Sequence, residues 1–387
     1  MRSEFVQIPN LPTVSRREFL VLAAGAAVGG CRLLPGEDDA ALVRARAEAL
    51  DQLAKGYFTG AAFARSDRGE AGFVGWQGRG SETGAVDART KFDAASLTKT
   101  VVAAVASLMV ADGRLDPDAP FVRYLPDHAA GGNCPITVRQ VATHTSGFGH
   151  AVASARRDNP TLNLATRPFE ERLLAQKPER APGRCKYSCY NFQLLALLLE
   201  RLGGKPIDVL AREMLFEPLG MNDSRWWPVA DDGHVMHADA LPKENFIVRK
   251  VGCVSDPSAY HAGRPTGNAG LFTTLGDLRR FTADLLHRER FPRQYYELLF
   301  TCQHEDAESR RSFGFDMSEA GHPAGLSPRT IHHSGYTGQY LCVDPETDFA
   351  GVVLTVRSAD VGTLAGRRRI LACLAGTAID ADAAGVV

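Results

Sequence analysis

Apolar residues recur at helical spacing in several stretches of the chain. Residues 40–54 (AALVRARAEALDQLA) place apolar side chains at helical intervals, whereas residues 97–112 (LTKTVVAAVASLMVAD) are apolar nearly all round. The first pattern predicts an amphipathic helix, and the second predicts a helix buried on every side that ends at Gly113. Further helices are expected over residues 191–204, 274–288 and 363–377.

Strand-like segments occur near both ends of the chain. FTGAAFARS (58–66) and AGFVGWQG (71–78) are separated by a turn, and YLCVDPE (340–346) and FAGVVLTVR (349–357) form a second pair. The residues between the two pairs are helical and loop-rich. This order predicts an α/β chain of the α+β type, in which an antiparallel sheet is flanked by the terminal helices. A helical lobe, roughly residues 115–270, would be inserted between the two halves of the sheet.

Composition adds little to this picture but excludes some partners. The chain has 387 residues, of which 44% are hydrophobic and 23% charged, as in ordinary globular proteins. Its net charge of −1 leaves no basic excess for a nucleic acid, so we expect no such partner. After a linker at residues 32–39, we expect a single large domain over residues 40–380.

The first 31 residues have the pattern of an export signal. SRREFL precedes the short apolar segment VLAAGAAVGG, which is too short to span a bilayer, and then Cys31. The adjacent Arg16 and Arg17 resemble the twin-arginine type of signal, and residues 28–31 (VGGC) resemble a lipoprotein cleavage box. We therefore predict an exported, periplasmic or membrane-anchored protein, attached to the membrane only through a lipid on Cys31. The alternative is a buried N-terminal helix.

The cysteines predict neither a disulfide scaffold nor a metal site. The chain has eight, seven of them after Cys31, and no C-x-x-C pair occurs. There is no H-E-x-x-H motif, and the adjacent His332 and His333 would point to opposite faces of a strand. We expect most cysteines to be small buried side chains, and we expect no cofactor and no metal.

One short stretch, FDAASLTKT (92–100), suggests chemistry. Ser96 and Lys99 are three residues apart at the start of the apolar helix, so their side chains would share one face. A serine hydroxyl needs a base within reach, and the apolar wall would lower the pKa of Lys99 by desolvation. Taken alone, the pair is better explained as a helix N-cap and a lysine that extends to solvent.

Two later stretches strengthen the catalytic interpretation. Tyr187 precedes the apolar helix at 191–204, where its phenol could relay a proton to a leaving group. His333, Ser334 and Gly335 come at the start of a late strand, where the glycine would let a substrate lie along the strand edge.

With these stretches, the chain resembles the penicillin-recognising serine hydrolases, the family of class C β-lactamases, D,D-carboxypeptidases and related esterases. The resemblance covers roughly residues 40–380. It rests on FDAASLTKT, ADGRLDPDAP, ITVRQVATHTSGF, APGRCKYSCYNFQLLALLLE, FEPLGM, GNAGLFTTLGDL and HHSGYTGQYLCVDPE. It implies a β-lactamase/transpeptidase-like fold and a reaction through an acyl-serine intermediate.

The resemblance assigns roles residue by residue. Ser96 matches the nucleophile, Lys99 its base partner and Tyr187 the tyrosine of the family's Y-x-N element. His333-Ser334-Gly335 matches the K-T-G element in an H-x-G form. The N–H groups of Ser96 and of Tyr336 would then form the oxyanion hole.

The chain departs from the family pattern at two substrate-binding positions. Cys189 stands where the family most often has Asn, and a thiol is a weak hydrogen-bonding partner. His333 replaces a permanent cation, so carboxylate recognition is expected to depend on pH near neutrality. We therefore expect an esterase or a D,D-peptidase-like enzyme in preference to a true β-lactamase, acting on a small-molecule or peptidoglycan-derived substrate.

Two other functions fit the sequence less well. A non-catalytic sensor of peptidoglycan fragments would keep the fold and lose turnover, but the intact Ser96, Lys99 and Tyr187 argue against it. An α/β-hydrolase is set aside because the chain has no G-x-S-x-G motif.

Overall fold

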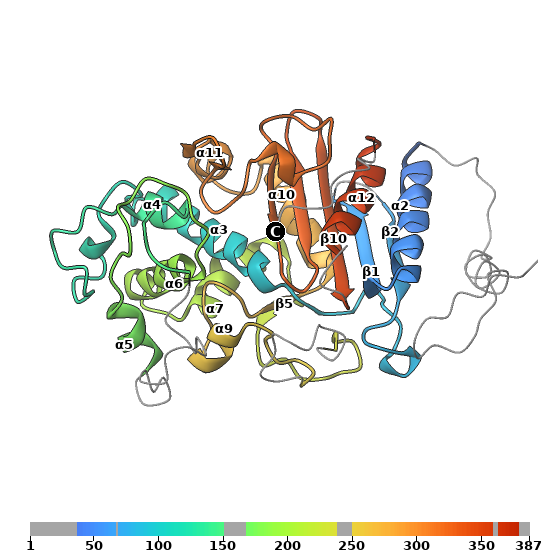
Figure 1. The fold of residues 1–387 in the computed structure, drawn as a ribbon, viewed down its shortest axis with the longest axis horizontal. Coiled ribbons are helices and arrows are strands. Elements are labelled where there is room, and N and C mark those ends of the chain that lie inside the picture. Colours follow the sequence, from blue (N-terminus) through green and yellow to red (C-terminus); the bar gives the residue numbers. More distant parts are fainter. Residues whose placement is uncertain (1–36, 67–68, 151–167, 238–249, 359–362, 379–387) are drawn as a thin grey trace, which may run out of the picture.

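The computed structural model describes residues 37–66, 69–150, 168–237, 250–358 and 363–378 (Figure 1). The predicted signal segment and Cys31 lie outside the described residues, so export and lipidation stay predictions. Within the described ranges, none of the helices combines the length and the apolar character that crossing a bilayer requires.

The main sheet joins the two ends of the chain. It has five antiparallel strands in the order β2-β1-β10-β9-β8. The strands are β1 (Phe58–Arg65), β2 (Ala71–Gly75), β8 (Ile331–Ser334), β9 (Tyr340–Asp344) and β10 (Phe349–Arg357). Ala62 of β1 lies opposite Leu354 of β10, almost three hundred residues later. The predicted α+β arrangement of one antiparallel sheet with helices between its halves is therefore confirmed.

Helices cover both faces of this sheet. α2 (Glu37–Ala54) and α12 (Thr363–Ala375) pack together on one face, and α10 (Leu275–His287) packs on the other (Figure 1). Alternation along β1 explains the arrangement, because successive side chains of a strand point to opposite faces. Phe63 packs into the cluster under α2 and α12, whereas its neighbour Ala62 belongs to the main core. The first helix begins three residues before the expected position 40.

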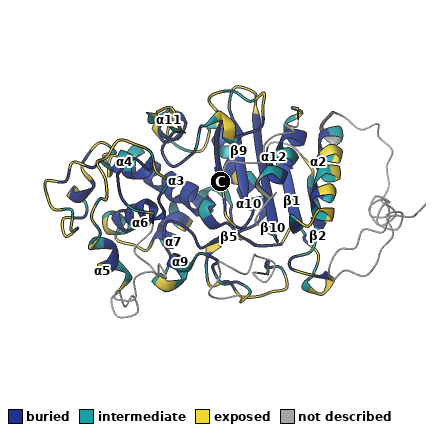
Figure 2. Cartoon of the chain, viewed as in Figure 1, coloured by how far each residue is buried: buried dark blue, intermediate teal, exposed yellow. Residues whose placement is uncertain are grey.

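The second part of the molecule is helical and surrounds α3 (Thr98–Ala111). α3 is buried along nearly its whole length (Figure 2), as its continuous apolar sequence predicts. It packs against α6 (Cys189–Gly203), α7 (Ile207–Ala211) and α11 (Arg293–Phe300). The remaining helices are α4 (Val138–Ala142), α5 (Phe169–Leu174), α8 (Glu217–Leu219) and α9 (Pro257–Ala262), with a π-helical segment at Arg212–Phe216.

Shorter elements connect the two parts. A three-stranded sheet has the order β3-β5-β4, with β3 at Phe92–Asp93, β4 at Arg225–Trp226 and β5 at Leu271–Thr273. β6 (His304–Glu305) and β7 (Arg310–Arg311) form a hairpin. The 3-10 turns are η1 (Ser81–Thr83), η2 (Ala95–Leu97), η3 (Phe121–Arg123) and η7 (Glu319–Gly321). β3, η2 and α3 follow one another directly, so the predicted nucleophile lies where the sheet part meets the helical part.

Candidate active site

Ser96 lies in the tight turn η2, between β3 and α3. Its neighbour Ala95 has φ +45°, a conformation that a residue with a side chain rarely adopts. The buried carboxylate of Asp93 accepts a hydrogen bond from the Ala95 N–H at 2.9 Å and so holds this turn. The strained turn leaves Ser96 only half-buried, although the residues around it are buried.

Lys99 meets Ser96 as the i, i+3 spacing predicts. Its Nζ donates hydrogen bonds to Ser96 Oγ and to the backbone oxygen of Asn268, both at 2.9 Å. The side chain is completely buried in the first turn of α3. The ammonium is thus fixed between the nucleophile and the segment that precedes β5.

Tyr187 reaches the same hydroxyl from the other part of the chain. It lies just before α6, and its phenol donates a hydrogen bond to Ser96 Oγ at 2.9 Å. The Nζ of Lys99 lies 5.0 Å from the centroid of the Tyr187 ring, and the His144 ring packs on that ring at 4.6 Å. Ser96 Oγ therefore has two titratable partners at equal distance.

The charge of Lys99 differs from the expectation drawn from the sequence. Burial lowers the pKa of Lys99, as expected, but attraction to Cys189 and a hydrogen bond with Tyr187 outweigh this effect and leave the pKa above its ordinary value. The predicted neutral amine is therefore wrong for the resting site, where Lys99 is an ammonium at neutral pH. Burial, against the opposing effect of Lys99, raises the pKa of Tyr187, so the phenol is neutral there.

Cys189 is the first residue of α6 and is buried beside these groups. Burial raises the pKa of its thiol, but the Lys99 ammonium and a hydrogen bond with His150 outweigh this effect, and the net pKa is below the ordinary value. A buried thiol thus stands beside the reacting groups, where the family usually places an amide.

His333, Ser334 and Gly335 lie at the end of a strand, and their predicted place at the start of one is wrong. His333 and Ser334 end the short strand β8, and a tight turn at Gly335–Gln339 leads into β9. The His333 ring centroid lies 6.4 Å from that of Tyr187, while Ser334 and Tyr336 are exposed. His332 points the other way and packs on Tyr340, as alternation requires.

His333 is neutral, so the predicted pH-dependent cation near neutrality is also wrong. Burial, followed by repulsion from Lys99 and Arg311, lowers the pKa of His333 to about 3. Its Nδ1 lies 2.8 Å from the backbone oxygen of Ser334. Its buried Nε2 has no hydrogen-bond partner among the described residues. At physiological pH this position offers a substrate a neutral imidazole.

The turn at 335–339 is tied to the nucleophile turn. Thr337 Oγ1 and Gln339 Nε2 donate to the backbone oxygen of Asp93 at 2.6 and 3.0 Å. A Cβ on Gly335 would lie 2.6 Å from the backbone oxygen of Ala94, so only glycine permits this approach. These contacts hold the 335–339 turn against the segment that leads into Ser96.

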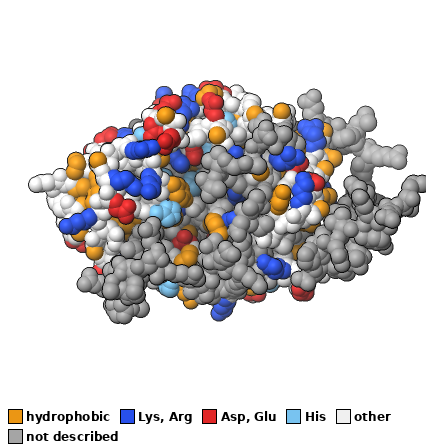
Figure 3. Space-filling view, viewed as in Figure 1, with side chains coloured by type: hydrophobic (Ala, Val, Ile, Leu, Met, Phe, Trp, Pro, Cys, Tyr) orange, Lys and Arg blue, Asp and Glu red, His pale blue; other side chains and the backbone are white. Residues whose placement is uncertain are grey.

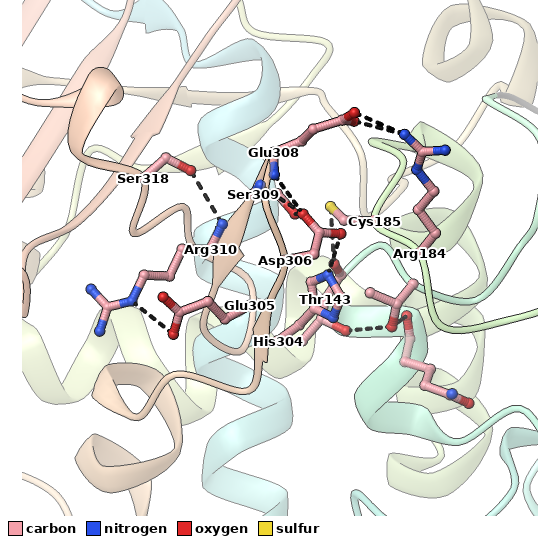
Figure 4. Close-up of polar contacts among 12 residues, drawn as sticks. Thr143, Arg184, Cys185, His304, Glu305, Asp306, Glu308, Ser309, Arg310 and Ser318 are labelled. Atoms are coloured by element: carbon pink, nitrogen blue, oxygen red, sulfur yellow. Dashed lines mark hydrogen bonds and ion pairs between the residues drawn. The ribbon is translucent and has the colours of Figure 1, made fainter.

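A polar rim borders the site on the side of the β6–β7 hairpin. Figure 4 shows the hairpin beside residues 184–185, which lead into Tyr187, with Arg184 paired to Glu308 at 2.9 Å. Asp306 binds the backbone N–H groups of Glu308 and Ser309 and so shapes the tip of the hairpin. The Arg184–Glu308 pair is exposed and contributes little to stability.

Two participants were missed in the sequence. Asn268 contributes a backbone oxygen, which no side-chain pattern reveals. Asp93 joins Ala95 to Ser255 through its carboxylate and binds the 335–339 turn through its backbone oxygen. The only sequence signal for Asp93 was its position three residues before Ser96, and this position did not indicate that its carboxylate is buried.

The seven described cysteines are free thiols. In the described ranges, no group of three or more His, Cys, Asp or Glu side chains is arranged to hold a metal ion.

Comparison with known proteins gives one matching family model, described as Beta-lactamase, over residues 42–375. The D-alanyl-D-alanine-carboxypeptidase/endopeptidase AmpH of Escherichia coli K12 is 25% identical over 286 residues, covering 68% of this chain and 70% of that protein. Esterase EstB of Burkholderia gladioli is 32% identical over 222 residues, covering 49% and 56%.

Solved structures agree on the fold. EstCE1, described as a hydrolase with promiscuous acyltransferase activity, superimposes with a TM-score of 0.73 at 20% identity, over 88% of this chain and all of that chain. A class C β-lactamase gives 0.70 at 17% identity, over 88% and 98%. These likenesses confirm the predicted β-lactamase/transpeptidase-like fold.

Proposed function

We propose, from the premise that this chain belongs to the beta-lactamase family, that it is a serine hydrolase which forms an acyl-enzyme on Ser96 and acts on esters or amides. The observation that carries the proposal is the convergence on Ser96 Oγ of Lys99 Nζ and the Tyr187 hydroxyl, each at 2.9 Å. A nucleophile with two proton carriers in reach matches the needs of acyl transfer.

The reaction follows from these contacts. Ser96 Oγ attacks the substrate carbonyl, and its proton passes to the basic form of the Lys99–Tyr187 pair, which titrates as a unit. The pair then returns the proton to the leaving group, and water releases the acid in a second cycle. The N–H groups of Ser96 and Tyr336 stabilise the oxyanion of each tetrahedral intermediate.

We further propose that the site prefers esters with an uncharged acyl group. His333 is neutral where the K-T-G form of the element has a lysine, and Cys189 provides no amide to bind a peptide. A substrate carboxylate, as in a penicillin or a D-Ala-D-Ala peptide, therefore gains less here than an uncharged group. The name of the EstB relative supports an esterase, and that of the AmpH relative keeps peptides as the second substrate class.

Export remains part of the proposal on the strength of Arg16-Arg17 and the apolar segment before Cys31. A lipid on Cys31 would be the attachment to the membrane. On the face in Figure 3, basic and acidic side chains are interspersed.

The test is hydrolysis of 4-nitrophenyl butyrate, together with the intact mass of the protein after mixing with benzylpenicillin. Ser96→Ala should abolish hydrolysis, while Ser146→Ala, whose hydroxyl binds Asn191 at 2.7 Å outside the reacting centre, should retain it. A penicillin adduct that depends on Ser96, without ester hydrolysis, would shift the proposal to peptides. Ligand binding that survives Ser96→Ala, without any turnover, would replace it by the sensor.

A further inference from the structure

A buried guanidinium lies behind the turn that carries Tyr336. Arg367 of α12 has only 5% of its surface exposed, and its Nη1 donates to the backbone oxygens of Gly335 at 2.9 Å and Gln339 at 2.7 Å. Among the described residues, no carboxylate pairs with Arg367, and its Nε has no hydrogen-bond partner. The side chain is thus a buried cation whose contacts are two carbonyl groups.

Stability alone does not account for this arrangement. Burial, together with repulsion from Arg357, lowers the pKa of Arg367 to about 9, which shows that the interior disfavours the charge. Neither carbonyl depends on the guanidinium, because Gly335 O also accepts from the Gly338 N–H at 3.0 Å and Gln339 O from the Gly335 N–H at 2.8 Å. Both oxygens therefore already have a hydrogen-bond partner, and the presence of a buried charge beside them requires another explanation.

The reason lies in the geometry of the peptide bond. The carbonyl of Gly335 and the N–H of Tyr336 belong to one planar trans peptide, so they point in opposite directions. Arg367 holds the oxygen toward α12, and the N–H is therefore directed away from α12. Gly335 itself lies close to the nucleophile turn, because a Cβ added to it would lie 2.6 Å from Ala94 O.

We propose that Arg367 is a positioning residue that fixes the plane of the Gly335–Tyr336 peptide, so that the Tyr336 N–H stays directed at the substrate oxygen. The inference rests on the proposed function, because it assigns a task to the oxyanion hole of that reaction. Arg367 touches neither the substrate nor Ser96 and acts only through this peptide.

Arg367 adds a second restraint on the Gly335 carbonyl, beside the hydrogen bond from the Gly338 N–H. The turn contains two glycines, Gly335 and Gly338, and glycine restricts the backbone dihedral angles less than any other residue. Gly338 has φ +112°. Rotation of the 335–336 peptide would replace an N–H donor by a carbonyl oxygen facing the oxyanion. Because the loss of a single oxyanion donor reduces kcat by about 100- to 1000-fold, holding that donor in place has a large effect on the rate.

The test is the Arg367→Met variant of the full chain, assayed with 4-nitrophenyl butyrate. We expect kcat to fall roughly 10- to 100-fold with KM changed less than twofold, since only the transition state uses the oxyanion donor. Phenylboronic acid, whose serine adduct places an oxygen in the oxyanion hole, should bind more weakly by a similar factor. The urea midpoint should stay equal or rise, because a buried charge is removed and both carbonyls keep a partner.

Two matched variants sharpen the result. Arg369→Met removes a guanidinium from the same helix that instead pairs with Glu48 at 2.6 Å, and it should keep the wild-type kcat. Arg367→Lys, which restores a cationic donor near both carbonyls, should recover part of the loss. Equal kcat in the Met and Lys variants, or a fall in the urea midpoint that accounts for the lost activity, overturns the inference.

The same assay separates this inference from the proposed function. A wild-type protein without Ser96-dependent hydrolysis and without a boronate complex overturns both. If the wild-type protein hydrolyses the ester and the Arg367→Met variant has the same kcat and boronate affinity, only the role of Arg367 is overturned.

Discussion

Replacing Tyr187 by Phe removes one hydroxyl from the reacting centre and leaves the ring in place. The hydroxyl donates to Ser96 Oγ at 2.9 Å, whereas the ring makes separate contacts with Lys99 at 5.0 Å and with His144 at 4.6 Å. Those ring contacts survive the substitution, and Ser96 Oγ keeps its bond from Lys99. The Tyr187→Phe variant therefore measures the phenol hydroxyl alone.

The expected effect on rate is much larger than the effect on stability. One hydrogen bond to the half-buried Ser96 contributes about 1 kcal/mol to the free energy of unfolding. A proton carrier in the transition state contributes about 10²- to 10⁴-fold, or about 3 to 5.5 kcal/mol of activation free energy. We expect kcat/KM of Tyr187→Phe to fall by that factor while the free energy of unfolding changes by at most about 1 kcal/mol.

Tyr190, one turn further into α6, provides the opposite control. Its hydroxyl is fully buried, donates to the Leu173 oxygen at 2.8 Å and lies 2.7 Å from His128 Nε2. Tyr190→Phe leaves these buried partners without the hydroxyl and should lower the free energy of unfolding by about 1 to 3 kcal/mol. It should leave kcat/KM unchanged, because the partners of its hydroxyl, Leu173 and His128, are not those of Ser96 Oγ.

The two quantities are measured by release of 4-nitrophenol from an ester and by urea unfolding of the same preparations. A Tyr187→Phe variant with kcat/KM within threefold of the wild type would show that the phenol carries no proton. Equal losses of activity in the Tyr187 and Tyr190 variants would show that the hydroxyls act through the fold.

Three other outcomes follow from the geometry and the charges. Because the pKa values of Lys99 and Tyr187 are both raised, the basic form of the pair increases with pH, and kcat/KM should rise from pH 7 to pH 9; a profile flat from pH 7 would contradict this. Gly335→Ala places a Cβ 2.6 Å from a backbone oxygen of the nucleophile turn and should reduce ester hydrolysis at least 100-fold; activity near wild type would refute the close approach. Burial lowers the pKa of His332 to about 4, so between pH 6.5 and 4 the unfolded chain binds a proton that the folded chain excludes. His332 alone contributes about 3 kcal/mol to the fall in the free energy of unfolding across that window. In urea titrations at pH 7 and 4.5, the His332→Gln variant should therefore lose less stability than the wild type; an equal loss would count against the reasoning.

Local pattern determined much of the architecture. The continuous apolar run over residues 97–112 predicted the buried α3, because a helix apolar on all sides must be enclosed. The glycines that end α3 and α6 have positive φ, as their sequence positions indicated. The short helices α5, α9 and α11 were not predicted, since elements of six to eight residues depend on packing more than on their own pattern.

In the candidate site, too, the sequence predicted the local contacts but not the contacts between distant segments. The spacing of Ser96 and Lys99 is local, one turn of one helix, so the sequence alone predicted that the two side chains meet. The matching motifs also indicated Tyr187 and Gly335. They did not show that β8 ends after four residues, because the turn at 335–339 is held by contacts from Asp93 and α12 that lie far away in the chain.

Tertiary structure alone decided the charges of the site. The sequence predicted a neutral Lys99 and a titrating His333, whereas the folded site has an ammonium at Lys99 and a neutral ring at His333. A pKa depends on the depth of burial and on every charge within a few ångströms, and those neighbours come from segments distant in sequence. Spacing along the chain fixes which groups of one helix can meet, but only the packing of separate elements fixes the electric field in which they react.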